Sequence, residues 1–260
     1  MYQSKLLKSF DFIEHCFFGR HMGEKCGVSE KEFSSLNTSF FTQDSQKNIL
    51  PNRKIIENHL QCKNPISTLK QVHSTDIFNI TNILSLDNMQ NIQGDGLLCV
   101  MQNLPIGVYT ADCIPLLFVE KNYKIIGAIH CGWKGLLNGI IENTIAQINS
   151  NTYFDSQIYA VIGPAIGKKS YEVGNDFYIE HLKIDDNSKN FFSAKDKNKF
   201  LFDIKGYAKY RLINCGVLID NIDDLGIDTF ENEDEFFSHR RSTLRGEKNR
   251  GLQMSCIFLK

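Results

Sequence analysis

Three side chains in this sequence, His73, Cys113 and His130, have the types and positions that could do chemistry. Each lies beside a turn or at the end of a strand-like run, which is where sheets expose functional side chains. Two imidazoles and one thiolate suit zinc, which binds nitrogen and sulfur ligands tetrahedrally and in catalytic sites keeps a fourth position for water or substrate. Bound zinc lowers the pKa of water to roughly 7. The trio therefore predicts a metal-dependent active centre.

The spacing of these residues leaves two other interpretations open. The three are separated by dozens of residues, unlike the ligands of a compact metal motif, so they could be two hydrogen-bonded histidines and a buried thiol. Alternatively, Cys113 and His130 could form a nucleophile–base pair in which Asp112 or Gln71 orients the imidazole. Such a pair does not need His73, so that residue discriminates between a metal centre and a cysteine hydrolase.

Short apolar runs bounded by turn residues predict the strands that must position the trio. The runs are 96–101, 106–110, 114–120, 124–130, 158–162 and 256–259. Their continuous rather than alternating apolar character predicts strands that are covered on both faces. Cys113 then falls between two strands, and His130 ends another.

Helices are predicted at 52–61, 136–149 and 202–215. Apolar residues of 136–149 recur close to a 3.6-residue period, and Gly216 can end the helix over 202–215. Strands and helices mix without a regular βαβ rhythm, which predicts an α+β fold with helices packed around a mixed sheet. Only five prolines occur and no linker divides the chain, so we expect one domain spanning residues 1–260. The polar stretch 183–199 is the best candidate for a mobile surface insertion.

Composition excludes several classes of protein. Hydrophobic residues make up 42% and charged residues 23% of the 260 residues, as in soluble globular proteins. The net charge of −1 gives no global field favouring nucleic acid or an anionic membrane. No apolar run approaches the ~20 residues of a membrane span, and the N-terminus lacks a signal peptide. A cytoplasmic protein is expected, in which the eight cysteines, none in a CxxC pair, are mostly buried reduced thiols.

Motifs along nearly the whole chain resemble the YfiH-like family, also called the laccase-domain or polyphenol-oxidase family and described as purine nucleoside phosphorylases. The resemblance rests on many segments in the correct order: His15-Cys16-Phe17-Phe18-Gly19-Arg20, Gly27-Val28-Ser29, Ser35-Leu36-Asn37, Asn52-Arg53, Gln71-Val72-His73-Ser74, Gly94-Asp95-Gly96, Thr110-Ala111-Asp112-Cys113-Ile114-Pro115, His130-Cys131-Gly132-Trp133-Lys134-Gly135, Ile162-Gly163-Pro164-Ala165-Ile166-Gly167, Tyr171-Glu172-Val173-Gly174 and Phe237-Ser238-His239-Arg240-Arg241.

The resemblance implies a role for several residues. His73, Cys113 and His130 correspond to the family's metal-binding, catalytic trio. It also implies that Arg53 is important for activity and that Asn37 and Arg20 are substrate-binding residues near the metal. The fold that it implies is a single-domain mixed β-sheet sandwich flanked by helices, resembling the cysteine hydrolase fold that YfiH-like proteins share with bacterial toxin deamidases.

Some positions depart from the family's usual pattern. Lys134 stands where arginine is common, Cys131 where alanine is common, and Ala165 where cysteine is common. Near the C-terminus, Leu252 replaces the arginine of a usual Gly-Arg-Gln, and Arg250 lies two residues earlier. None of these changes touches the trio, so they bear on substrate preference more than on chemistry.

The leading hypothesis is a zinc-dependent purine nucleoside phosphorylase that acts on adenosine, inosine and methylthioadenosine and also deaminates adenosine. The expected partners are thus a purine nucleoside and phosphate, and no nucleic acid or membrane. The alternatives are a cysteine- or metal-dependent hydrolase of peptidoglycan precursors, a copper-dependent polyphenol oxidase, and a binding module without activity. A single Cys-His-His trio does not supply the several copper centres of a true laccase.

Four further residues have both a functional and a structural interpretation. Arg53, near the start of the predicted helix 52–61, could grip phosphate together with the helix N-terminus, or form a surface ion pair. Arg240 could bind substrate, but adjacent residues on an extended segment point oppositely, so at most one of Arg240 and Arg241 should face the site. Trp133 is expected to pack against the loop rather than bind substrate.

Asp112 precedes Cys113 directly and should point away from the metal, because adjacent side chains on an extended segment point in opposite directions. We expect it to organise its loop through hydrogen bonds.

Overall fold

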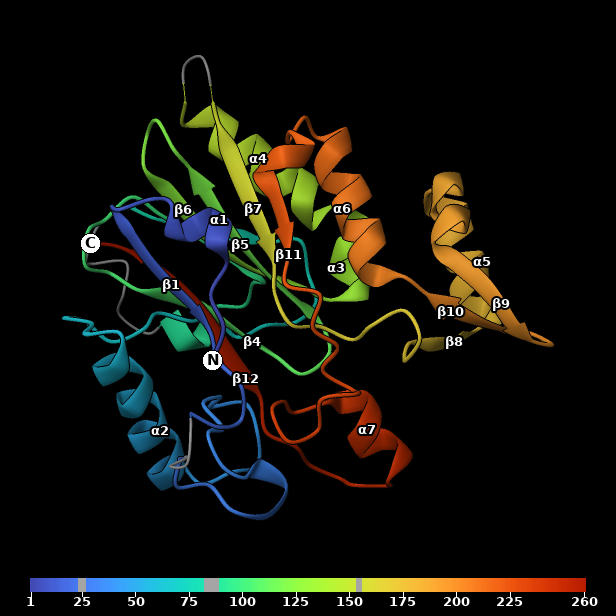
Figure 1. Ribbon diagram of the computed structural model, residues 1–260, viewed down its shortest axis with the longest axis horizontal. Helices are drawn as coiled ribbons and strands as arrows, with labels where there is room; N and C mark the ends of the chain where they lie inside the picture. The colour runs from blue at the N-terminus through green and yellow to red at the C-terminus, as the bar shows by residue number, and fades with distance from the viewer. Residues whose placement is uncertain (23–26, 82–88, 153–155) are drawn as a thin grey trace.

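The strands of this protein form three sheets, which the computed structural model describes over residues 1–22, 27–81, 89–152 and 156–260 (Figure 1). The largest has six strands in the order β11-β7-β5-β6-β3-β2. Their bounds are β2 Ile77–Ile80, β3 Gly96–Cys99, β5 Ile114–Glu120, β6 Ile125–Cys131, β7 Ile158–Ile162 and β11 Ile222–Asp224. Pairing is antiparallel except at the two edges, where β11 runs parallel to β7 and β2 parallel to β3.

A second, antiparallel sheet packs face to face on the first. It consists of β1 (Ile13–Phe17), β12 (Gln253–Leu259) and β4 (Ile106–Thr110), with β12 in the middle. Side chains alternate between the two faces of a strand, so Leu117 and Val119 of β5 meet this second sheet, whereas Leu116 and Phe118 face the other way. The confirmed α+β fold is therefore a sandwich of two sheets with apolar layers on both sides of β5.

Helices cover the outer faces of the sandwich (Figure 1). Helices α4 (Ile140–Ser150) and α6 (Ile204–Asn214) contribute to the apolar cluster on the outer face of the six-stranded sheet, and α2 (Gln46–His59) contributes to the cluster on the outer face of the three-stranded sheet. The remaining elements are short; their bounds are α1 Lys5–Lys8, α3 Trp133–Asn138, α5 Asn175–Ile184, α7 His239–Leu244 and the 3₁₀ helices η1 Lys31–Phe33, η3 Met89–Asn91, η4 Asp186–Phe191 and η5 Ile219–Asn221.

The third sheet projects beside the sandwich together with α5 (Figure 1). Its strands are β8 (Glu172–Gly174), β9 (Phe192–Asp196) and β10 (Lys199–Phe202), in the order β8-β10-β9. The prediction that 183–199 is a mobile insertion is wrong, because this segment contains the end of α5, η4 and β9. Its charged residues face outward, while ring contacts that include Phe192 with Phe202 at 4.5 Å fix it to its neighbours.

Most of the predicted strands agree with the structure, and the helices are displaced. Strands 106–110, 114–120 and 158–162 match, whereas the C-terminal strand begins three residues earlier than predicted. The helix predicted over 136–149 is two helices, since Gly139 adopts a φ of +102° that glycine tolerates and that ends α3. Helix α6 begins at Ile204, because Phe202 still pairs in β10.

Helix α2 shows the largest displacement. It begins at Gln46, capped by the Ser45 side chain, and contains Pro51 in its interior. The predicted start at Asn52 is therefore six residues too late. Arg53 consequently lies in the middle of this helix rather than at its N-terminus.

No helix within the described ranges has the length and apolar character needed to cross a membrane. The seven described cysteines are free thiols, and four of them, Cys16, Cys99, Cys131 and Cys256, are buried. Cys26 lies outside the described residues.

Candidate metal centre and its cavity

Cys113 lies where the chain crosses from one sheet of the sandwich to the other. Strand β4 of the three-stranded sheet ends at Thr110, and β5 of the six-stranded sheet begins at Ile114. The three intervening residues form a bend in which Asp112 has a φ of +87°. This crossing turns the thiol of Cys113 out of the core, and the residue is partly exposed.

The two histidines reach Cys113 from different segments of the chain. His130 lies near the end of β6, paired with Pro115 of β5, and is buried. His73 lies in the segment before β2, has a φ of +61° and is exposed. Its Nε2 is 3.7 Å from Cys113 Sγ, and its ring centroid is 4.7 Å from that of His130. The structure thus brings the trio together.

Close packing around the trio depends on a glycine. A Cβ atom at Gly132 would lie 2.4 Å from His73 Cδ2 and 3.4 Å from Cys113 Sγ. Any side chain there would push His73 away, because such a distance is well inside van der Waals contact.

The donor set and its geometry fit a metal ion. One ligand atom from each of His73, Cys113 and His130 lies within 4.8 Å of the other two, the only such group of three found among the described residues. Two nitrogens and one sulfur are typical of a zinc site that leaves a position open. These three side chains could therefore hold one metal ion where the central strands β5 and β6 of the six-stranded sheet begin and end.

Asp95 orients the histidines and is fully buried. Its carboxylate accepts a hydrogen bond from His130 Nδ1 at 2.7 Å. It also accepts hydrogen bonds from three consecutive backbone amides, those of Val72, His73 and Ser74, at 2.7–3.1 Å. A carboxylate can only accept here, so Nδ1 of His130 is the protonated nitrogen and Nε2 is available as a ligand.

Asp95 was not predicted from the sequence. The signal that could have found it is a carboxylate between two glycines immediately before a strand, since a metal-bound histidine usually donates its other N–H to a carboxylate or carbonyl.

The charges of the centre stabilise one another. Burial raises the pKa of Asp95, but hydrogen bonds from His130, Ser74 and Val72 outweigh it and hold this pKa below the usual value. Burial likewise opposes ionisation of Cys113, yet His130 and His73 lower the pKa of its thiol to about 6. The negative neighbours Cys113 and Asp95 overcome burial and raise the pKa of His130 to about 9. Without a metal, the pair therefore favours a thiolate beside an imidazolium.

Two members of the trio, His73 and Cys113, line a cavity of about 280 Å³ with chemically different walls. The third, His130, is buried and is not part of the lining. Trp133 and Tyr171 provide aromatic surface, and α7 contributes polar side chains. The full lining is His73, Ala111, Asp112, Cys113, Trp133, Ile166, Tyr171, Ile204, His239, Arg240 and Thr243.

The two aromatic residues are fixed from behind. Trp133 packs against Phe177 at 4.8 Å and His181 at 5.8 Å. Tyr171 packs against Phe177 at 6.0 Å and Phe202 at 5.8 Å, while its hydroxyl makes no hydrogen bond to a described residue. Trp133 thus both packs the loop, as expected, and lines the cavity.

Arg240 and Arg241 lie on helix α7 rather than on an extended segment, so the predicted element was wrong. Successive residues of a helix are rotated by roughly 100° about its axis, so the two side chains point in different directions. Of the two arginines, only Arg240 lines the cavity of the trio. Its Nη2 donates to the carbonyl of Glu172 at 2.7 Å. Arg241 instead donates to backbone carbonyls, including those of Thr229 and Phe230.

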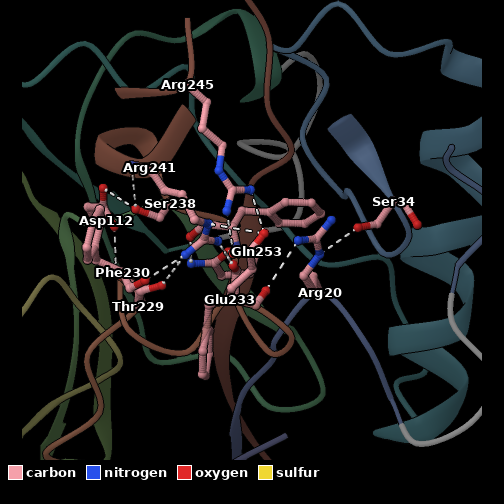
Figure 2. Close-up of polar contacts among 12 residues, drawn as sticks. Arg20, Ser34, Asp112, Thr229, Phe230, Glu233, Ser238, Arg241, Arg245 and Gln253 are labelled. Carbon is pink, nitrogen blue, oxygen red and sulfur yellow. Dashed lines mark hydrogen bonds and ion pairs between the residues drawn. The ribbon is translucent and has the colours of Figure 1, made fainter. Parts of the chain in front are cut away.

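Asp112 organises its loop through hydrogen bonds, as the sequence suggested. Its carboxylate accepts from Thr229 Oγ1 at 2.7 Å and from Ser238 Oγ at 2.9 Å (Figure 2). It also accepts from the backbone amide of Arg240 at 2.6 Å. It therefore fastens the start of α7 to the turn that carries Cys113.

Arg53 does not lie in the cavity of the trio. It is buried within α2, where its guanidinium donates to Tyr109 Oη and to the carbonyl of Ile66 and lies over the Phe40 ring. It borders a different cavity, of about 670 Å³. The expectation of an anion site at a helix N-terminus is wrong at Arg53, because seven residues of α2 precede it.

Asn37 and Arg20 also lie outside the cavity of the trio. Asn37 is fully buried and cross-links its loop, donating to Thr42 Oγ1 and accepting from the backbone amide of Leu252. Arg20 donates through Nε to the carbonyl of Ser34 at 2.7 Å. It lines another cavity, on the far side of α7 from the trio. The structure thus unites only Arg240 of the four other predicted site residues with the trio.

The departures from the family pattern lie around the centre rather than in it. Cys131 follows His130 on β6 but belongs to the apolar core, and burial raises the pKa of its thiol. Ala165 is likewise buried in that core. Lys134 is exposed on α3 and Leu252 is half-buried.

Several known proteins are similar to this chain. A family described as multi-copper polyphenol oxidoreductase laccase matches residues 14–260. A purine nucleoside phosphorylase of Rickettsia conorii is 32% identical, covering 90% of this chain and 95% of its own. The purine nucleoside phosphorylase YfiH of Escherichia coli is 30% identical, covering 90% of each chain. The solved structure of YlmD from Geobacillus stearothermophilus has a TM-score of 0.85 and 26% identity, covering 96% of this chain and 93% of its own.

Replacing Asp95 by Asn should weaken zinc binding by ~10–100-fold, because the orienting negative charge behind His130 is lost. The affinity is measured by competition with a chromophoric chelator. Asp76→Asn, a matched change at an exposed neighbour, should bind zinc like the wild type. Equal affinity in both variants would contradict the role of Asp95.

Cys113 should be the first cysteine alkylated in zinc-free protein. Its thiol ionises as the pH rises through about 6, whereas burial raises the pKa values of the other six described thiols. Iodoacetamide labelling followed by peptide mass spectrometry should give a half-maximal rate near pH 6 at Cys113, with protection by added zinc. A midpoint near pH 9 would show that the histidines do not activate this thiol.

Proposed function

This chain belongs to the family described as multi-copper polyphenol oxidoreductase laccase, and within it we propose a zinc-dependent purine nucleoside phosphorylase that also deaminates adenosine. One observation carries the proposal: a single cavity is lined by His73 and Cys113 of the trio, two aromatic side chains and an arginine, while His130 is buried beside it. The bacterial relatives named purine nucleoside phosphorylases support this substrate class.

The aromatic side of the cavity suits a purine base. Trp133 and Tyr171 offer ring faces and edges that favour stacked or edge-on contact with a flat heteroaromatic ring. Burial and the nearby negative charges of Cys113 and Asp112 raise the pKa of the Tyr171 hydroxyl, which keeps it protonated. We assign it as a hydrogen-bond donor to a heteroatom of the nucleoside.

Arg240 suits phosphate. One of its N–H groups is held by the carbonyl of Glu172, which fixes the plane of the guanidinium. The other N–H groups make no hydrogen bond to a described residue and can form a paired contact with a phosphate oxyanion. His239 and Thr243 on the same helix lie beside it in the cavity wall.

Both reactions then use the same bound nucleoside. In phosphorolysis an oxygen of phosphate bonds to C1′ of the ribose while the bond from C1′ to the purine breaks, and the base leaves with a proton. In deamination the oxygen of water bonds to C6 of adenine while the bond from C6 to the exocyclic amino nitrogen breaks. The amino group takes a proton from the water and leaves as ammonia. Zinc held by the trio would supply Lewis-acid chemistry.

A cysteine hydrolase of peptidoglycan precursors is the second candidate. The chain of contacts from Asp95 through His130 to Cys113 matches an orienting group, a base and a nucleophile. The copper oxidase is less well supported, because the described residues form one such trio and a laccase needs several copper centres.

The test is incubation of purified, metal-analysed protein with adenosine and phosphate, followed by chromatography. Ribose 1-phosphate with adenine supports phosphorolysis, and inosine supports deamination. His73→Ala should lower turnover by at least ~100-fold, because two ligands seldom hold a catalytic zinc. His59→Ala, at an exposed position on α2, serves as the control. Near wild-type turnover of metal-free His73→Ala would instead favour the cysteine hydrolase.

Tyr171→Phe should reduce kcat/KM for the nucleoside by ~5–10-fold, as expected for one lost hydrogen bond of about 1–1.5 kcal/mol. The ring packing against Phe177 and Phe202 is retained, so thermal stability should stay near that of the wild type. Tyr178→Phe is the matched control, because Tyr178 stacks on Phe200 in the projecting sheet. Unchanged kcat/KM in Tyr171→Phe would remove the hydroxyl from substrate binding.

A further inference from the structure

Helix α7 separates the cavity of the trio from a second cavity of about 570 Å³. His239, Arg240 and Thr243 line the first, whereas Arg241 and Ser242 line the second. Segments from both ends of the chain complete the wall of the second cavity, which we call the rear cavity. Figure 2 shows Arg20, Arg241 and Arg245 gathered around Glu233 in its wall.

The lining of the rear cavity carries excess positive charge. Six basic side chains but only three acidic ones border it; the basic ones are Arg20, Lys31, Arg241, Arg245, Lys248 and Arg250. Arg245 forms a bidentate ion pair with Glu233, with N–O distances of 2.5 and 2.6 Å. Glu32 and Glu247 are the other two carboxylates. Three positive charges therefore remain without a matching carboxylate in the lining.

Backbone carbonyls hold two of these arginines, and the one carboxylate near them, Glu233 at 4.0 Å from Arg241, is already paired with Arg245. Arg241 donates to the carbonyls of Thr229 and Phe230 at 3.0 and 2.9 Å, and Arg20 donates to those of Ser34 and Glu233 at 2.7 and 3.3 Å. Carbonyl contacts fix the position of a guanidinium but leave its full charge in place. The wall is thus a rigid cationic surface.

Arg250 is the exception, because its guanidinium has no protein partner in the described part of the chain. Its Nε is buried and makes no hydrogen bond there, although buried polar groups in folded proteins are nearly always paired. Burial lowers the pKa of Arg250, and the negative charges of Asp112 and Cys113 only partly oppose this effect. A half-buried arginine whose buried Nε has no partner among the described residues, in the wall of a cationic cavity, calls for an anion.

We propose that the rear cavity binds a small anion carrying a phosphate or diphosphate group, with Arg250 as its principal ligand. A guanidinium presents paired N–H groups that match phosphate oxygens, and a diphosphate would match the three uncompensated charges. Lys31 and Lys248, both exposed, supply charge at the rim. The site is separate from the phosphate position proposed at Arg240, since α7 lies between them.

The test is calorimetric titration with inorganic phosphate, pyrophosphate and adenosine 5′-monophosphate at constant ionic strength set with chloride. All measurements use protein carrying Arg240→Met, so that the cavity of the trio contributes no guanidinium. In this background we expect saturable binding. It should be tightest for pyrophosphate if the site takes a free diphosphate. It should be tightest for adenosine 5′-monophosphate if the site takes the phosphate of a nucleotide. Adding Arg250→Met should weaken binding at least ~10-fold, the loss of a charge-assisted contact.

Lys197→Met is the matched control, because it removes an equal charge from the exposed turn between β9 and β10 and should leave binding unchanged. Arg250→Lys, which keeps the charge, should bind better than Arg250→Met, and circular dichroism checks that each variant is folded. If Arg250→Met does not fold, Lys31→Met with Lys248→Met should still weaken pyrophosphate binding. Absence of saturable binding in the Arg240→Met background, or equal binding after Arg250→Met, would overturn the proposal. Neither result depends on nucleoside turnover, so the proposed function is tested separately.

Discussion

The carboxylate of Asp95 is fully buried and accepts hydrogen bonds from three consecutive backbone amides and from the imidazole of His130. A buried charge is tolerated only when it is well compensated, and here the compensation itself builds the centre. The same oxygens that fix the tautomer of His130 also set the path of the backbone at His73. Two of the three candidate ligands are thus positioned by one residue, which lies outside the cavity.

The third ligand depends on the sandwich. Cys113 occupies the three-residue crossing between β4 and β5, which belong to different sheets, so the packing of the two sheets fixes where the thiol lies. Asp112 then ties this crossing to the start of α7 through Ser238 and the amide of Arg240. Helix α7 is consequently placed relative to the metal ligands, and with it Arg240 on one side and the cationic rear cavity on the other.

These constraints explain why the cavity has three different walls. His73 and Cys113 contribute candidate metal ligands, Trp133 at the start of α3 and Tyr171 just before β8 contribute aromatic rings, and α7 contributes Arg240. Phe177 of α5 and Phe202 of β10 pack against these aromatic rings from behind. A nucleoside and phosphate require such a division, since a flat base, a sugar carbon and an oxyanion must lie side by side.

The sequence by itself determined the α+β class, the central strands and the trio as candidate metal ligands. Runs of buried apolar residues and residues of ligand type at strand ends are local properties, and the resemblance of the motifs added the family. Tertiary structure alone decided the rest. Because α2 begins at Gln46, Arg53 does not lie at a helix N-terminus, and Asn37 and Arg20 are held in loops away from the trio. Asp95, Tyr171 and Arg250 acquired their significance only in the folded chain, because hydrogen bonding and charge compensation depend on neighbours distant in sequence.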